Sequence, residues 1–102
     1  MRAIRVAVAG LGVVGSETVR LLRSRRESLA RRLGARLELA AVCDRSAAAA
    51  RRLALPASVR RVADPARLIA LPGVDAVVEL LGGMGAARSL VLIVDDPDAP
   101  DP

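Results

Sequence analysis

Six residues near the start of the chain have the types and the spacing of a phosphate-binding turn. They follow an apolar run that ends at Ala9, have the pattern G-x-G-x-x-G, and are Gly10, Leu11, Gly12, Val13, Val14 and Gly15. In such a turn the first glycine allows a tight bend, the second lets the backbone approach a pyrophosphate, and the third lets a helix pack closely on a strand. The free N–H groups at the start of that helix then face the phosphate charge. The pattern predicts a dinucleotide-binding turn, although a strand, glycine turn and helix that bind nothing would show the same pattern.

A charged pair, Asp44 and Arg45, follows the second apolar run of the chain, residues 37–43. At this place in a nucleotide-binding unit an acidic residue binds the ribose hydroxyls of the adenosine half, while an arginine can bind a 2′-phosphate. Asp44 lies 34 positions after Gly10 (44 − 10), and a long first helix accounts for the excess over the usual spacing of about 20. Asp44 could equally be a helix N-cap or a turn residue. The pair therefore indicates NADP or NAD as the cofactor without deciding between them.

The elements around these motifs alternate as in a parallel α/β sheet. Apolar, β-rich runs predict strands at residues 4–9, 37–43, 59–62 and 75–81. Helical spacing predicts a first helix over residues 13–33, with Val14, Leu21 and Leu22 on its apolar face and Gly34 as its C-cap. Further helices are expected at residues 46–53, with Ser46 as N-cap, at residues 65–71 after an Asp64 cap, and at residues 85–94. The predicted fold is α/β, an incomplete Rossmann-type doubly wound parallel sheet of about four strands with crossover helices.

A second glycine turn, Gly82-Gly83, ends the predicted fourth strand. The first and fourth strands should be neighbours, because ligands of such sheets bind where the strand order reverses. The two glycine turns would then face each other across one crevice. Alternatively, Gly82-Gly83 belongs to an ordinary glycine-containing loop without a ligand.

Composition limits the classes of protein that the chain can belong to. Its 102 residues allow one small domain, and a hydrophobic fraction of 53% is sufficient for a buried core, although there is no Phe, Tyr or Trp. All 16 basic residues are arginine and the sequence pI is near 11.4, which could suggest nucleic acid. The arginines are spread over several elements, and no aromatic side chain is available to stack a base. We therefore interpret the arginines as solvent-exposed residues on helix surfaces and expect no nucleic-acid partner.

The single cysteine, Cys43, excludes an internal disulfide and fits a reducing cytoplasm. The apolar start of the chain is interrupted by Arg5 and lacks a convincing cleavage site, so it is not read as a signal peptide. No stretch reaches membrane-spanning length. We expect a cytoplasmic protein without a membrane partner. No metal site is expected either.

Three segments, at residues 8–22, 29–42 and 74–83, are similar in order and spacing to a known family. Over residues 2–92 the chain resembles the N-terminal NAD(P)-binding domain of homoserine dehydrogenase. The resemblance implies an oxidoreductase that interconverts L-homoserine and L-aspartate 4-semialdehyde in threonine, methionine and isoleucine biosynthesis. It implies that the turn at residues 10–15 holds the pyrophosphate and adjoining ribose, that Asp44 or Arg45 faces the adenosine ribose, and that Leu81, Gly82 and Gly83 lie near the nicotinamide.

The chain also departs from the family pattern. Val13 stands where the family usually has a hydroxyl residue, and Gly85-Ala86-Ala87-Arg88 replaces a Glu-Pro-Ala-Arg-like segment. The similarity ends near Leu92, before the family's lysine-bearing segment and its substrate and dimerisation domain, and this chain contains no lysine. We therefore expect a partial NAD(P)-binding domain at residues 1–94, an acidic, proline-rich, disordered tail at residues 95–102, no substrate domain and no catalytic residue.

We expect this chain to be a fragment of the enzyme, and we expect the fragment to bind the cofactor without turnover. The alternative is a stand-alone NAD(P)-binding or partner-docking module, and a weaker one is another Rossmann dehydrogenase with a related first half. A sheet that ends at its fourth strand would leave an open edge, through which the chain could self-associate.

Overall fold

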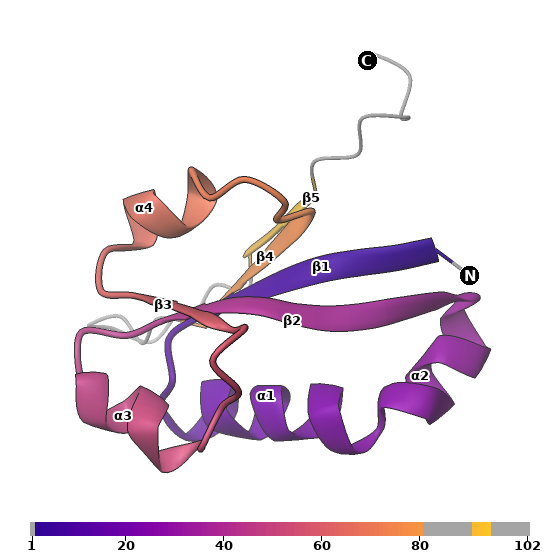
Figure 1. Ribbon diagram of the computed structural model, residues 1–102, viewed down its shortest axis with the longest axis horizontal. Coiled ribbons are helices and arrows are strands. Elements are labelled where there is room, and N and C mark those ends of the chain that lie inside the picture. The colour runs from indigo at the N-terminus through magenta and orange to yellow at the C-terminus, as the bar shows by residue number, and fades with distance from the viewer. Residues whose placement is uncertain (1, 81–90, 95–102) are drawn as a thin grey trace.

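The computed structural model describes residues 2–80 and 91–94. They form a five-stranded sheet in the order β3-β2-β1-β4-β5 (Figure 1). Four strands are parallel to one another: β1 (Arg2–Ala9), β2 (Ala35–Cys43), β3 (Arg60–Val62) and β4 (Ala76–Glu79). The fifth, β5 (Val91–Val94), pairs antiparallel with β4. The predicted doubly wound α/β fold is confirmed, including the central position of β1 between β2 and β4.

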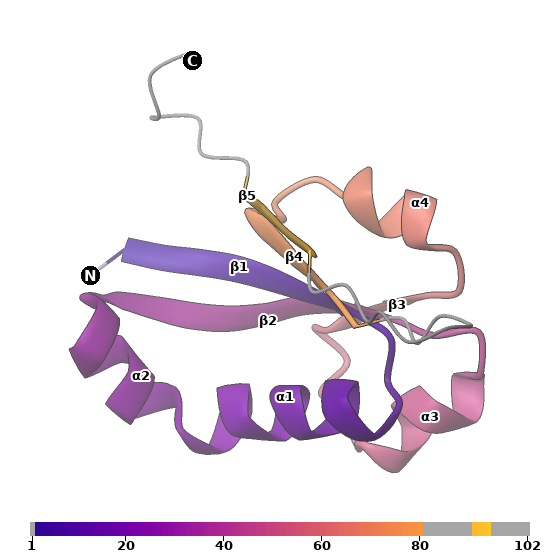
Figure 2. The same ribbon diagram turned by 180° about the vertical axis from the view of Figure 1, so that it is seen from behind.

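Helices cover both faces of the sheet. One face carries α1 (Val13–Ser24), α2 (Arg26–Leu33) and α3 (Ala47–Arg52), and the other carries α4 (Pro65–Ile69), as Figures 1 and 2 show from opposite sides. Asp64 begins α4 as predicted, because its side chain accepts a hydrogen bond of 2.9 Å from the Ala66 N–H.

The core is divided by the sheet into two layers of small aliphatic side chains. Successive side chains of a strand point to opposite faces, so Val8 packs toward Val19 of α1, whereas Ala7 and Ala9 pack toward Leu68 of α4. Leu68 is the largest side chain that is fully buried among the described residues. With no aromatic residue available, close approach of small side chains holds both layers together.

The first helix differs from its prediction. Residues 13–33 form two helices, which meet at Arg25 (φ −104°, ψ 21°). The bend directs α2 toward β2, where Ala30 is buried and Gly34, at φ 67°, ends the helix as predicted. Val14 and Leu21, which lie on the predicted apolar face, are about half exposed.

The C-terminal part of the chain also differs from its prediction. Residues 91–94 form a strand, so the helix predicted for residues 85–94 is wrong at its end. This run consists of Val, Leu and Ile and is largely β-branched, which favours an extended backbone. Residues 85–90, the proposed tail at residues 95–102, and Leu81, Gly82 and Gly83 lie outside the described residues. Among the helices that the structure describes, none is both long and apolar enough to cross a membrane.

Candidate functional site

The glycine turn leaves the carboxyl end of β1 between its two neighbouring strands. Gly10 is buried with φ 97°, a conformation that favours glycine, and its N–H donates to the Cys43 carbonyl of β2 at 2.8 Å. On the other side, the Leu80 N–H donates to the Ala9 carbonyl at 2.7 Å. The turn therefore starts from a position fixed by both adjacent strands.

The second and third glycines of the turn have opposite surroundings. A Cβ atom on Gly15 would lie 1.6 Å from the Gly10 carbonyl oxygen, so α1 contacts the turn in a way that only glycine permits. A Cβ atom on Gly12 would meet nothing within 4 Å. Close packing explains why residue 15 is a glycine, whereas the space beside Gly12 is open to a ligand.

The start of α1 faces this space without a side chain of its own to cap it. Gly12 is the N-cap residue, the first helical hydrogen bond runs from the Ser16 N–H to the Gly12 carbonyl at 2.9 Å, and the first turn carries no acidic residue. The initial N–H groups of a helix have no partner within the helix and carry its positive dipole end. Val13 beside them is 84% exposed, so an anion could reach this backbone from solvent.

Ser16 supports the turn, and the sequence interpretation missed it. Its hydroxyl donates to the Leu11 carbonyl at 2.9 Å. A hydroxyl residue immediately after the third glycine was the available signal, although no periodicity argument uses it.

Asp44 joins the end of β2 to the glycine turn. Its Oδ2 accepts a hydrogen bond from the Leu11 N–H at 2.8 Å, and its Oδ1 accepts one from the Ser46 N–H, also at 2.8 Å. The carboxylate thus forms a turn within its own loop and reaches across to the site. Ser46 occupies the N-cap position of α3, but its side chain makes no capping bond.

Arg45 lies on the same loop, but its side chain is not held by contacts of this kind. Its side chain is exposed, and within the described part of the chain it makes neither a hydrogen bond nor an ion pair. The structure therefore brings Asp44 into contact with the turn at residues 10–15, whereas Arg45 makes no such contact with the described residues.

This geometry agrees with the comparison with known proteins. Residues 10–94 match the family model described as homoserine dehydrogenase, NAD binding domain. The chain belongs to this family of NAD-binding domains. Its fold is that of a domain that binds NAD(P).

Relatives agree with the family assignment. The homoserine dehydrogenase of Neisseria gonorrhoeae is 40% identical over 92 residues, which are 90% of this chain and 21% of that protein. The Methylobacillus glycogenes enzyme is 36% identical over 92 residues, again 90% of this chain and 22% of the relative. The chain thus spans about a fifth of the length of the curated relatives that it matches.

Solved structures show the same fold. A crystal structure of S. aureus homoserine dehydrogenase aligns with a TM-score of 0.66 and 23% identity, over 82% of this chain and 21% of that one. At this level of identity the similarity concerns the architecture of the domain.

In this NAD-binding domain, Cys43 lies directly before Asp44 and is buried and unpaired. Burial raises the pKa of its thiol, and the nearby Asp44 and Asp64 carboxylates raise this pKa further. A raised pKa lowers the thiolate fraction, so Cys43 is a packing residue and not an activated nucleophile. The described residues contain no cluster of three or more His, Cys, Asp or Glu side chains placed to hold a metal ion.

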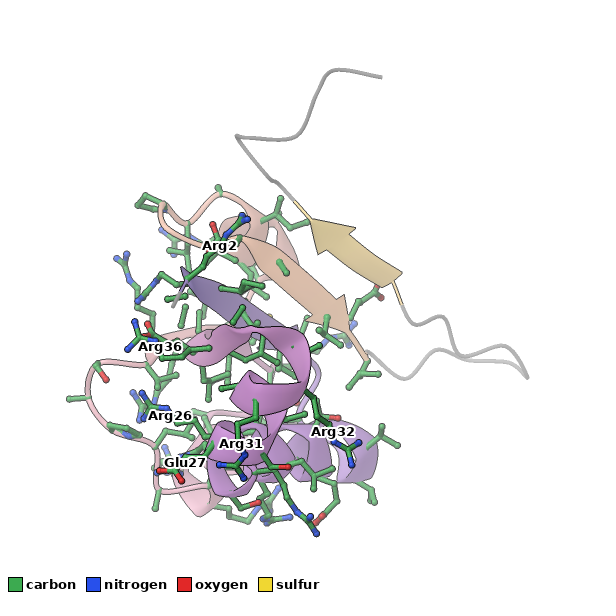
Figure 3. The ribbon with its side chains drawn as sticks, turned by 90° about the vertical axis from the view of Figure 1, so that its right-hand side faces the viewer. Arg2, Arg26, Glu27, Arg31, Arg32 and Arg36 are labelled. Carbon is green, nitrogen blue, oxygen red and sulfur yellow. The ribbon has the colours of Figure 1, made fainter. Side chains whose placement is uncertain are left out.

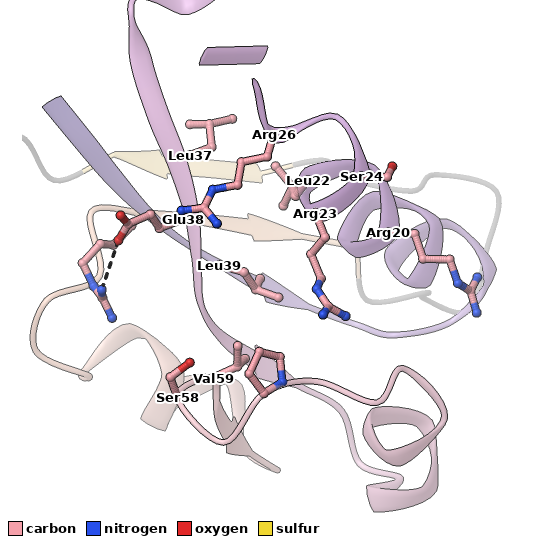
Figure 4. A pocket seen from close by; sticks show the side chains of 12 residues that line it. Arg20, Leu22, Arg23, Ser24, Arg26, Leu37, Glu38, Leu39, Ser58 and Val59 are labelled. Carbon is pink, nitrogen blue, oxygen red and sulfur yellow. Dashed lines mark hydrogen bonds and ion pairs between the residues drawn. The ribbon is translucent and has the colours of Figure 1, made fainter. Parts of the chain in front are cut away.

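A groove of about 980 Å³ opens elsewhere, beside the first halves of β1 and β2 (Figure 4). Its floor is apolar, with Leu22, Leu39 and Val59, while Arg23 and Arg26 stand on its rim. None of its lining residues belongs to the glycine turn or to the loop at residues 44–45. The groove is therefore separate from the glycine turn and from the Asp44 loop.

Arginine side chains gather beyond this groove, around α2 and the start of β2 (Figure 3). Arg26, Arg31 and Arg32 are exposed and make no ion pair within the described residues, while Arg36 lies 3.8 Å from the Glu38 carboxylate. These side chains lie far along the molecule from the turn at the carboxyl end of β1, as expected of a solvated helix face.

Proposed function

We propose that this chain is the cofactor-binding part of a homoserine dehydrogenase and binds NAD or NADP at the carboxyl end of its sheet. The observation that carries this proposal is the open space beside Gly12, at an uncapped and accessible helix start. Phosphate groups bind at such helix starts because N–H groups and the helix dipole both favour negative charge. The open space beside Gly12 supports an NAD(P) pyrophosphate at this position.

The residue roles follow from their places around this space. The pyrophosphate and adjoining ribose would contact the turn formed by Gly10, Leu11, Gly12, Val13, Val14 and Gly15. Asp44 or Arg45 would face the adenosine ribose, and Leu81, Gly82 and Gly83, outside the described residues, are proposed to lie near the nicotinamide. Because Val13 has no hydroxyl, contacts at that position would be made by the backbone alone.

The proposed enzyme would interconvert L-homoserine and L-aspartate 4-semialdehyde. The nicotinamide supplies the hydride chemistry, and the protein must bind and orient the reactants. This chain offers residues that can bind the cofactor. It contains no lysine, the residue type that the family resemblance implies at the active site. We propose that residues 1–94 bind the cofactor without turnover, so homoserine-dependent reduction of NAD(P) by the purified chain would contradict this part of the proposal.

The proposal also includes a cytoplasmic location, the absence of a nucleic-acid partner, and self-association through an open sheet edge. Because β5 pairs with β4, the predicted open edge at the fourth strand is wrong, and the outer edge on this side is that of β5. The opposite edge of the sheet, β3, carries Arg60 and Arg61, and charged edges discourage pairing with another sheet. The β5 run of four residues contains no charge. Sedimentation velocity would measure this association. The family match does not favour a separate partner-docking module.

Titration of nicotinamide fluorescence tests cofactor binding directly. The chain has no Trp or Tyr, so NADH and NADPH emission can be followed without protein fluorescence. We expect saturable binding by the wild-type chain and at least about a tenfold loss of affinity in Gly12→Ala, because the added methyl group occupies the space that the pyrophosphate needs. The free energy of unfolding of this variant should fall by less than about 1 kcal/mol, since Gly12 is an N-cap with φ −70°.

Gly34→Ala is the matched control. A Cβ there also meets nothing within 4 Å, but the position lies at the end of α2 and has φ +67°. Its stability should therefore fall by about 1 kcal/mol while its affinity stays unchanged. Equal affinity of Gly12→Ala and the wild-type chain would contradict the proposed site, as would a folded wild-type chain that binds neither nucleotide.

A further inference from the structure

We propose that this chain selects NAD over NADP and that the fixed carboxylate of Asp44, not the guanidinium of Arg45, decides the selection. This inference rests on the proposed function, because it assigns the class of dinucleotide that the same site accepts. The sequence alone leaves the choice open, since an acidic and a basic residue stand side by side. The hydrogen bonds of the two side chains distinguish them.

Two backbone segments hold the Asp44 carboxylate in place. Leu11 donates from the turn after β1, and Ser46 donates from the loop after β2, each at 2.8 Å. Moving the carboxylate away would break both bonds and would leave the Leu11 N–H, in a residue that is only 3% exposed, without its partner. The negative charge therefore stays at the carboxyl end of β2.

This fixed position suits a ribose diol and opposes a phosphate. A carboxylate has about four acceptor sites, so the two backbone bonds leave room to accept hydrogen bonds from ribose hydroxyls. A 2′-phosphate offers no comparable donor and brings negative charge against negative charge. A side chain free to rotate could withdraw from this contact, but Asp44 is tied to the turn.

Arg45 compensates only weakly for the repulsion between Asp44 and a 2′-phosphate. It is exposed, and no contact within the described part of the chain holds its guanidinium toward the ribose position. Binding a 2′-phosphate would first require this long side chain to lose its rotational freedom, and exposed ion pairs are weakened by solvent. The anchored charge of Asp44 therefore outweighs the exposed charge of Arg45.

Parallel titrations with NADH and NADPH test the selection in the wild-type chain. We expect NADH to bind about tenfold more tightly than NADPH, the effect of one unfavourable like-charge contact. In Asp44→Asn the ratio should approach one, because the charge is removed while an amide oxygen can keep one backbone bond. In Arg45→Ala the NADH:NADPH affinity ratio should change by less than about threefold.

Asp75→Asn is the matched control, since Asp75 also accepts a backbone N–H bond, from Arg5 at 2.8 Å, but at the other end of β1. Its NADH:NADPH ratio should equal that of the wild-type chain. Equal or tighter binding of NADPH by the wild-type chain would overturn the selection while leaving dinucleotide binding intact. An Asp44→Asn variant that loses both affinities equally would overturn the role of the charge. Failure of a folded chain to bind either nucleotide would instead refute the proposed function.

Discussion

The two ends of β1 are anchored by the same kind of contact, yet only the carboxyl end has the properties of a binding site. At the carboxyl end the Leu11 N–H, just beyond the strand, donates to Asp44. In the amino-terminal half of the strand, called the amino end below, the Arg5 N–H donates to Asp75, and both distances are 2.8 Å. Each contact connects residues more than 30 positions apart. An aspartate bound to backbone is thus a means of anchoring a strand, and it does not by itself identify a site.

The difference lies in what surrounds each anchor. At the amino end the Arg5 side chain binds neighbouring elements, donating from Nε to the Gly73 carbonyl at 2.9 Å and pairing with Glu38 at 3.5 Å, and the groove that it lines contains no part of the glycine turn. At the carboxyl end Gly12 leaves open space before the uncapped start of α1. Function here follows from unfilled space beside unpaired N–H groups, and the anchor serves to fix their position.

The largest expected effect is the loss of stability when Gly15, the packed glycine at the carboxyl end of β1, gains a side chain. In Gly15→Ala the new Cβ would lie 1.6 Å from the Gly10 carbonyl oxygen, and backbone on both sides prevents relief. We expect a loss of at least about 3 kcal/mol in the free energy of unfolding, which can abolish folding of a chain this small. Chemical denaturation would measure it against Gly12→Ala. Similar stability of the two variants would show that the turn and α1 are not packed as described.

A smaller effect should separate the two anchors themselves. Asp44→Ala leaves two backbone N–H groups without a partner, and one of them is partly buried, so we expect a loss of about 2–3 kcal/mol. Asp75→Ala breaks one exposed bond and retains the Asp75 N–H bond to the Arg5 carbonyl, so about 1 kcal/mol is expected. Urea unfolding of both variants would test the order. Equal losses would mean that the carboxyl end is no more dependent on its aspartate than the amino end.

Local signals in the sequence predicted the glycine turn and several helix ends correctly. The roles of Gly15, Gly34 and the Asp64 cap depend on backbone geometry within a few residues, which residue type largely determines. The bend at Arg25 carries no Gly or Pro and arises from packing of α2 on β2, so no local signal marks it. The strand at residues 91–94 likewise depends on its pairing with β4.

The candidate site was only partly predictable for the same reason. Its glycines and Asp44 were identified from type and spacing, but the bond between Asp44 and Leu11 joins residues from two different crossover units. Pattern analysis treated Asp44 as either a cofactor ligand or a turn residue. The structure shows that it forms a turn and also holds the glycine loop, and these two contacts are the basis for the proposed selection between NAD and NADP.

The smallest expected effect uses Cys43 as a probe of the carboxyl end. Burial first, and the Asp44 and Asp64 carboxylates second, raise the pKa of its thiol above the ordinary value of 9.0. The folded chain therefore holds this proton more tightly than the unfolded chain. The resulting stabilisation is fully present below the unfolded pKa and is lost as the pH rises through the folded pKa.

The composition of the chain makes this effect measurable. It contains no His, Lys or Tyr, so Cys43 is the one side chain that titrates between about pH 8.5 and pH 11. The free energy of unfolding should decline over this range in the wild-type chain and stay level in Cys43→Ala. Asp44→Asn should reduce the decline, because it removes one cause of the raised pKa, whereas Asp75→Asn at the amino end should leave it unchanged. An equal decline in Asp44→Asn and the wild-type chain would show that burial and Asp64 set this pKa, and that the anchored charge of Asp44 has little influence on the thiol.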